Sequence, residues 1–180
     1  MEFRETGFEG LWIIEPKVWK DNRGYFFESY NEDVFKKHGI DVNFKQDNQS
    51  FSQKGAVRGL HFQKEPFAQG KLVRVIKGAV KDVVLDIRTN SKTYGKHFDI
   101  ILSEENFLIF WIPPGFAHGF STLEDNTIFS YKCTNVYSKE SEGGIIFNDP
   151  ALGIDWEVEH PILSPKDLEL PLFKDFVSPF

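Results

Sequence analysis

The chain contains 180 residues, of which 41% are hydrophobic and 27% are charged, a composition typical of one domain with a core of its own. Its formal net charge of −6 disfavours a nucleic-acid-binding surface, because the phosphate backbone of a nucleic acid attracts basic patches. Any phosphate group would therefore be held by a few local arginines, which favours a small anionic ligand.

The start of the chain and its single cysteine indicate the cellular compartment. Residues 1–5, MEFRE, are charged and do not resemble a secretory signal, and no apolar run approaches the ~20 residues needed to span a bilayer. Cys133 alone can form neither an internal disulfide nor a thiolate metal site, so we expect a buried, inert thiol. We accordingly expect a single domain over residues 1–180 in the cytoplasm, with no nucleic-acid or membrane partner.

One helix is predicted in the first quarter of the chain. Asn31 is a suitable N-cap, Glu32 and Asp33 place negative charge in the first turn, and Gly39 ends the helix. A second, shorter helical turn is predicted near the carboxyl terminus, where residues 164–167, SPKD, combine a capping serine with a proline at the first helical position.

From about residue 57 the chain consists of short β-rich runs separated by turn signals. Residues 71–77, KLVRVIK, alternate polar and apolar side chains, as expected of a strand with one solvated or cavity-facing side. Evenly spaced short strands are typical of an antiparallel sandwich or barrel, so we expect an all-β jelly-roll barrel with a few short peripheral helices. The expected strands cover residues 57–62, 71–77, 79–87, 97–102, 107–112, 119–123 and 128–134.

Residues 113–118, PPGFAH, match P-x-G-x-x-H, the second motif of the cupin superfamily, in which a turn directs a histidine into a small β-barrel. The first cupin motif would supply H-x-H and a glutamate seven residues before a glycine. Here His61 is the first histidine, Gln63 replaces the second, and Lys71 stands seven residues before Gly78. A lysine cation would repel a divalent ion, and the remaining histidine pair is too small a ligand set. We therefore expect no metal.

The side chains that remain at the cupin positions can perform proton transfer. His61, His118 and Lys71 are expected to face one cavity, where an imidazole can accept a proton and an ammonium can stabilise an oxyanion. These are the groups that an enolisation requires. No glycine-rich dinucleotide loop is present, and Gly143-Gly144 is too short for one and is expected to form a turn. We expect no cofactor.

Several short sequence motifs occur in the same order as in one known family, and together they span nearly the whole chain. They are D-x-R-G-x-F-x-E at 21–28, QDNQS at 46–50, VRGLHFQ at 57–63, AQGKLVRV at 68–75, PGFAHGF at 114–120, YK at 131–132 and LSPKD at 163–167. This pattern resembles the dTDP-4-dehydrorhamnose 3,5-epimerase family. The resemblance implies a cofactor-free isomerase of dTDP-rhamnose biosynthesis, a pathway that supplies cell-envelope polysaccharide. It also implies a homodimer, to which the apolar residues 11–14, LWII, are expected to contribute.

The resemblance implies roles for five catalytic residues. His61 resembles the general base that removes the protons next to the 4-keto group, and Asp167 resembles the carboxylate that orients it. Tyr131 resembles the acid that delivers a proton to the opposite face of the sugar. Lys71, with His118 nearby, would hold the enolate oxygen.

Further residues resemble the contacts that the family makes with its dTDP-sugar. Arg23 and Arg58 resemble the residues that bind the diphosphate, for which the fixed donor fork of an arginine is well suited. Phe26 and Tyr137 are candidates for stacking on thymine. The remaining polar contacts implied by the resemblance are Glu28, Gln46, Asn48, Glu142 and Lys166.

Other activities are compatible with parts of this pattern. A single-position epimerase or a ketoisomerase of a related dTDP-4-keto sugar would use nearly the same residues, but the set of Tyr131, His61 and Asp167 favours inversion at carbons 3 and 5. A metal-dependent cupin oxygenase is disfavoured by Gln63 and Lys71. A noncatalytic sugar-binding barrel would not need a base and an acid on opposing faces.

Overall fold

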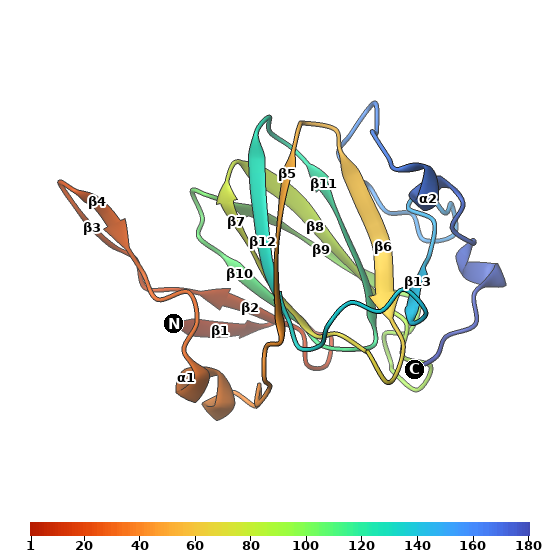
Figure 1. Cartoon of the computed structure of the whole chain (residues 1–180), viewed down its shortest axis with the longest axis horizontal. Helices are drawn as coiled ribbons and strands as arrows, with labels where there is room; N and C mark the ends of the chain where they lie inside the picture. Colours follow the sequence, from red (N-terminus) through yellow and green to blue (C-terminus); the bar gives the residue numbers. More distant parts are fainter.

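A computed structural model describes all 180 residues, and strands dominate it (Figure 1). The prediction of an all-β jelly-roll barrel with a few short helices is confirmed. The helices are α1 (Glu32–Lys37), α2 (Pro165–Leu168) and a 3-10 turn (Phe173–Asp175), and none of them is long and apolar enough to cross a membrane. The strands are β1 (Glu2–Glu5), β2 (Trp12–Glu15), β3 (Trp19–Asp21), β4 (Gly24–Phe26), β5 (Gln46–Ser52), β6 (Val57–Gln63), β7 (Lys71–Lys77), β8 (Ala79–Asp86), β9 (His97–Ser103), β10 (Ile109–Ile112), β11 (Phe116–Thr122), β12 (Thr127–Cys133) and β13 (Glu142–Gly144).

Two antiparallel sheets face each other to form the barrel. One has six strands in the order β1-β2-β10-β7-β12-β5, and the other has five in the order β13-β6-β11-β8-β9. Strands β3 and β4 pair only with each other, and the hairpin that they form projects away from the barrel on the side opposite α2 (Figure 1). The hairpin lies outside the barrel but contacts it, because Tyr25 packs edge-to-face on Phe107, in the loop between β9 and β10, with 4.9 Å between the ring centroids.

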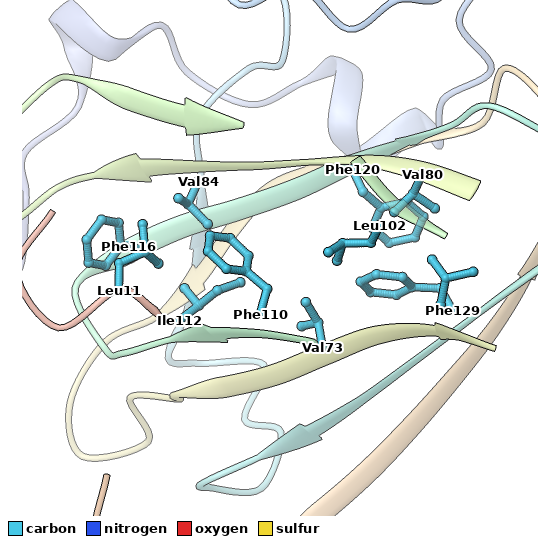
Figure 2. Packing of buried hydrophobic residues seen from close by; sticks show 11 residues of the cluster. Leu11, Val73, Val80, Val84, Leu102, Phe110, Ile112, Phe116, Phe120 and Phe129 are labelled. Carbon is cyan, nitrogen blue, oxygen red and sulfur yellow. The ribbon is translucent and has the colours of Figure 1, made fainter. Parts of the chain in front are cut away.

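Part of the space between the two sheets is filled by an apolar core (Figure 2). Val73 and Phe129, from β7 and β12 of the six-stranded sheet, meet Val84 and Phe120, from β8 and β11 of the five-stranded sheet. The Phe120 and Phe129 rings are in close tilted contact, with 4.3 Å between their centroids. This core fixes the separation of the sheets and so the width of the remaining interior.

The peripheral segments cover the outer faces of the two sheets. Phe35 and Ile40, in and after α1, pack with Leu72 and Trp111 on the outside of the six-stranded sheet. The C-terminal segment covers the outside of the five-stranded sheet, where Trp156 is buried in a second cluster. Each sheet is thereby protected from water on both sides over much of its area.

The N-terminal capping prediction for α1 is confirmed. Asn31 accepts a hydrogen bond from Val34 N at 3.3 Å, and Gly39 follows the helix with φ +81°. Ser164 caps α2 in the same way by accepting from Asp167 N, as expected from the sequence. Both helices thus begin at the predicted residues.

The expected turn at Gly143-Gly144 is wrong, because these residues lie in β13 and pair with β6. The physical reason is close approach of the two backbones: a Cβ atom at Gly144 would lie 2.6 Å from the Leu60 carbonyl oxygen. The apolar residues 11–14, expected to contribute to a homodimer, divide between two settings. Leu11 and Ile14 are buried within the chain's own cores, so only Trp12 and Ile13 are left half-buried.

Gly59 is expected to be indispensable for the junction between β6 and β11. Its φ is +125°, and a Cβ atom there would lie 2.5 Å from Gly119 Cα. We expect Gly59→Ala to lower the free energy of unfolding by more than about 2 kcal/mol. Gly153→Ala is the matched control, since Gly153 also has a positive φ of +62° but no neighbour within 4 Å, and should cost about 1 kcal/mol. Denaturant unfolding of both variants measures the difference, and equal losses would contradict the steric explanation.

Candidate active site

The interior space that the core leaves free is a cavity of about 470 Å³ between the two sheets. All five residues predicted to be catalytic line it, namely His61, Lys71, His118, Tyr131 and Asp167. They come from both sheets and from the C-terminal helix, so the fold brings together positions that are far apart in the sequence.

His61 in β6 and Asp167 in α2 form a hydrogen-bonded pair, with 2.7 Å between His61 Nε2 and Asp167 Oδ1. Burial raises the pKa of Asp167, but the hydrogen bond and charge of His61, with smaller contributions from Ser164 and the Gly59 backbone, lower the pKa below its ordinary value. The carboxylate is therefore ionised at neutral pH. Because an ionised carboxylate can only accept a hydrogen bond, Nε2 of the imidazole carries the proton. Nδ1 of His61 is left as the free base.

His118 forms a second pair, with a residue that the sequence analysis missed. His118 Nε2 lies 2.9 Å from Asp82 Oδ2, and both side chains are buried. Burial raises the pKa of Asp82 and lowers the pKa of His118, while each group partly opposes the shift of the other. Asp82 orients His118 toward the cavity. The available signal was a carboxylate in the middle of residues 79–86, AVKDVVLD, at the same alternation as Val80 and Val84, which face the core between the sheets.

Lys71 in β7 supplies the cationic group of the cavity. Burial lowers its pKa, against the opposing influence of Cys133, Asp82 and Glu142. An ammonium with a lowered pKa gives up its proton more readily and is little shielded by water, so it interacts strongly with a negative charge that develops beside it. Cys133 itself is free and fully buried, as predicted.

Tyr131 lies in β12 of the six-stranded sheet, whereas His61 belongs to the five-stranded sheet. Burial raises the pKa of Tyr131, so its phenol keeps its proton at neutral pH. The cavity therefore has a base from one sheet and a potential acid from the other. A flat substrate held between the sheets would meet the two groups on its opposite faces.

Gln63, at the position of a cupin metal ligand, uses its side-chain amide to hydrogen-bond backbone groups. Its Nε2 donates to the carbonyl oxygens of Phe67 and Val136 at 2.7 and 3.1 Å, and its Oε1 accepts from Ser138 N at 2.7 Å. No group of three or more His, Cys, Asp or Glu side chains lies in a position to hold a metal ion. The amide ties two loops to β6.

A smaller cavity of about 170 Å³ shares His61, Lys71 and Tyr131 with the main one. Its other lining residues include four of the predicted binding residues: Gln46, Asn48, Tyr137 and Glu142. The Tyr137 hydroxyl donates to Glu142 at 2.8 Å, and Lys166 Nζ pairs with the same carboxylate at 2.5 Å. These contacts link the smaller cavity to α2, the helix that carries Asp167.

Arg58 lines the main cavity and is held by a residue that was not predicted. Its Nε and Nη2 atoms donate to Ser52 Oγ at 3.3 and 3.2 Å. Ser52 is buried at the end of β5, so the guanidinium is positioned from inside the barrel. Its remaining donors are free to bind an anion.

Three predicted binding residues lie away from the cavity of their own chain. Arg23 and Phe26 belong to the projecting β3–β4 hairpin (Figure 1), and Phe26 is 70% exposed. The Arg23 guanidinium is paired with Asp21 at 2.6 Å. Glu28 follows the hairpin, is exposed, and accepts a hydrogen bond from Asn31. One chain does not bring these residues together with the catalytic group.

The family model described as dTDP-4-dehydrorhamnose 3,5-epimerase matches residues 5–175. The chain belongs to this family.

Individual relatives of the family match over almost the full length. The enzyme of that name from Methanothermobacter thermautotrophicus is 52% identical over 171 residues, covering 92% of each chain. The crystal structure of the Elizabethkingia anophelis dTDP-4-dehydrorhamnose 3,5-epimerase has a TM-score of 0.93 at 50% identity and covers 97% of both chains. A Legionella pneumophila dTDP-6-deoxy-D-glucose-3,5-epimerase in complex with dTDP-4-keto-L-rhamnose has a TM-score of 0.93 at 48% identity, covering 96% of this chain and 93% of its own.

The pKa of Asp167 predicts how this residue affects stability at acidic pH. Because its folded pKa lies below the ordinary value of 3.8, the carboxylate contributes stability that is present above that value and is lost as the pH falls through the folded pKa. We expect Asp167→Asn to lower the free energy of unfolding by about 1 to 3 kcal/mol at about pH 6. The difference from wild type should shrink below about pH 4. Denaturant unfolding across this range provides the measurement, and a pH-independent difference would contradict the assigned ionisation.

Proposed function

We propose that the chain is a cofactor-free epimerase that inverts carbons 3 and 5 of dTDP-4-dehydro-6-deoxy-D-glucose to give dTDP-4-dehydro-L-rhamnose. The observation that best supports this proposal is that one cavity is lined by a histidine from one sheet and a tyrosine from the other. The names of its relatives support the reaction, as does the Legionella pneumophila structure bound to dTDP-4-keto-L-rhamnose.

The reaction begins with removal of a proton next to the 4-keto group. Nδ1 of His61 takes the proton, and Asp167 stabilises the imidazolium that results. The negative charge moves to the former keto oxygen, where Lys71 and His118 stabilise it. A positioned base contributes about 10²- to 10⁴-fold and an oxyanion donor up to about 10³-fold, which is enough because a proton next to a ketone is already acidic.

Inversion requires that the proton returns from the other face. Tyr131 is neutral, lies in the opposite sheet, and delivers its proton to the enolate carbon. Reprotonation by His61 would instead restore the starting configuration. The same pair of groups acts at carbons 3 and 5, which flank the carbonyl on either side, once His61 has released its proton to water and Tyr131 has regained one from water.

The nucleotide is proposed to lie across the openings of both cavities. Arg58 binds the diphosphate, and Tyr137 stacks on thymine at the exposed rim. Gln46, Asn48, Glu142 and Lys166 supply the polar contacts to the sugar and base.

The projecting hairpin supports a homodimer in which each chain completes the site of its partner. A two-stranded hairpin is marginally stable by itself, and this one exposes Trp19, Tyr25 and Phe26. Packing against a second copy would bury these rings and carry Arg23 and Glu28 to the partner's cavity. A cytoplasmic location is also proposed, in agreement with a chain whose one cysteine forms no disulfide.

The reaction is tested in heavy water with dTDP-4-dehydro-6-deoxy-D-glucose, with deuterium at each carbon read by NMR. Wild type should couple deuterium uptake to inversion at carbons 3 and 5. Tyr131→Phe should still take up deuterium at the first carbon enolised but form little inverted product, because His61 can return a proton only to its own face. His61→Ala should lose exchange by about 10²- to 10⁴-fold.

Three outcomes would change the assignment. Deuterium at only one carbon in the wild type would show a single-position epimerase. Full inversion by Tyr131→Phe would assign the acid to another group. Loss of exchange in Tyr131→Phe as complete as in His61→Ala would mean that the phenol is needed to form the enolate.

The shared site is tested with mixed dimers. A dimer of one Arg23→Ala chain and one His61→Ala chain should contain one intact site, and at low substrate concentration should recover about half of the wild-type activity. The matched control is a dimer of one Arg58→Ala chain and one His61→Ala chain. Each substitution alters the cavity of the chain that carries it, so neither site is intact and no activity should be recovered. Equal inactivity of both mixtures would show that Arg23 does not act across the dimer.

A further inference from the structure

The inward-facing side of β5 is a row of four polar side chains. Gln46, Asn48, Ser50 and Ser52 alternate with exposed residues along the strand, and Ser50 lines the main cavity. A strand whose buried side is entirely polar adds little to the apolar core. These side chains must therefore be accounted for by hydrogen bonds or by a ligand.

Three of the four side chains have partners inside the chain. Gln46 donates to Asn48 at 3.0 Å and accepts from Tyr137 N at 2.8 Å. Ser52 accepts from Arg58. The Ser50 hydroxyl oxygen is buried and has no hydrogen-bond partner.

An unpartnered buried hydroxyl is unfavourable for folding, because it loses its bonds to water and gains none in return. A serine that served only the fold would be expected to bond a neighbouring backbone or side-chain group. The Ser50 hydroxyl, which lies beside the cavity, therefore remains available to hydrogen-bond a ligand.

The strand register places Ser50 between two parts of the site. In the pairing of β5 with β12, Asn48 is opposite Tyr131 and Ser50 is opposite Phe129. Ser52, which holds Arg58, follows two residues later, at about 7 Å along the strand. Ser50 thus lies between the proton-transfer groups, which act on the sugar ring, and the arginine proposed to bind the diphosphate.

We propose that Ser50 is a substrate-binding residue whose hydroxyl hydrogen-bonds an oxygen at the junction of the sugar ring and the diphosphate. The proposal rests on the proposed function, which places the ring beside Tyr131 and the diphosphate beside Arg58. Strands accept more than one χ1 rotamer, so a rotation about this bond directs the hydroxyl into the cavity. The partner oxygen is the 2-hydroxyl of the sugar or a β-phosphate oxygen.

Ser50→Ala tests this role in the full-length protein through its melting temperature, its affinity for dTDP, and kcat and KM with the keto sugar. The variant should be at least as stable as wild type, because it removes an unsatisfied group. Its kcat/KM should fall about 3- to 10-fold if the partner is a sugar hydroxyl, with dTDP affinity unchanged. If the partner is a β-phosphate oxygen, dTDP affinity itself should fall by about tenfold or more.

Ser130→Ala is the matched control, since Ser130 is in the neighbouring strand β12 and lines a hollow with Arg74 and Lys132 on the outer face of the sheet. Its kcat/KM should equal that of wild type. If Ser50→Ala kept kcat/KM and dTDP affinity within about twofold of wild type, the proposal would be overturned. Wild type that binds dTDP but does not convert the sugar would refute the proposed function instead, and a loss of dTDP affinity in Ser50→Ala would still support the contact.

Discussion

The hydrogen bond between His61 and Asp167 joins residues that are 106 positions apart in the chain. His61 is fixed within the barrel, whereas Asp167 lies on a four-residue helix that is too short to be stable alone. The tail that carries this helix is held by other contacts: Phe173 N donates to the Asp149 carboxylate at 2.6 Å, and apolar side chains pack on the five-stranded sheet. The orientation of His61, the proposed base, therefore depends on folding of the whole C-terminal segment.

The barrel interior is divided between a core that stabilises the fold and a cavity that does not. Phenylalanine, valine and leucine side chains fill one part (Figure 2), while two histidine–carboxylate pairs and a lysine line the rest. The lowered pKa of Lys71 and the raised pKa of Asp82 indicate that charged side chains are unfavourable in this part of the barrel interior. Perturbed titration of this kind is common where a protein performs proton transfer. The apolar core and the covered outer faces offset that unfavourable electrostatic free energy.

The parts of the fold and site that sequence could predict are those with a local pattern. Residues 71–77 alternate polar and apolar side chains and form β7, whereas residues 46–52 form β5 with a polar inner side and give no hydrophobic period. The five residues predicted to be catalytic followed from motifs and the family resemblance, and the structure places all five around one cavity. Asp82 was missed because its role depends on pairing with His118 in another strand. Arg23 was predicted to bind the diphosphate, but it lies on the β3–β4 hairpin away from the cavity of its own chain, a placement that no local sequence pattern encodes.

Cys133 lies opposite Lys71, a residue that lines the cavity, in the register of β12 and β7. Burial raises the pKa of its thiol, so little of it is present as thiolate, the form that reacts with peroxide. Oxidation to a sulfinic acid would place a permanent negative charge beside the Lys71 ammonium and would pair with it in place of the enolate. Because this thiol is buried and its pKa is raised, we expect it to resist such oxidation and to leave the charge of Lys71 facing the cavity.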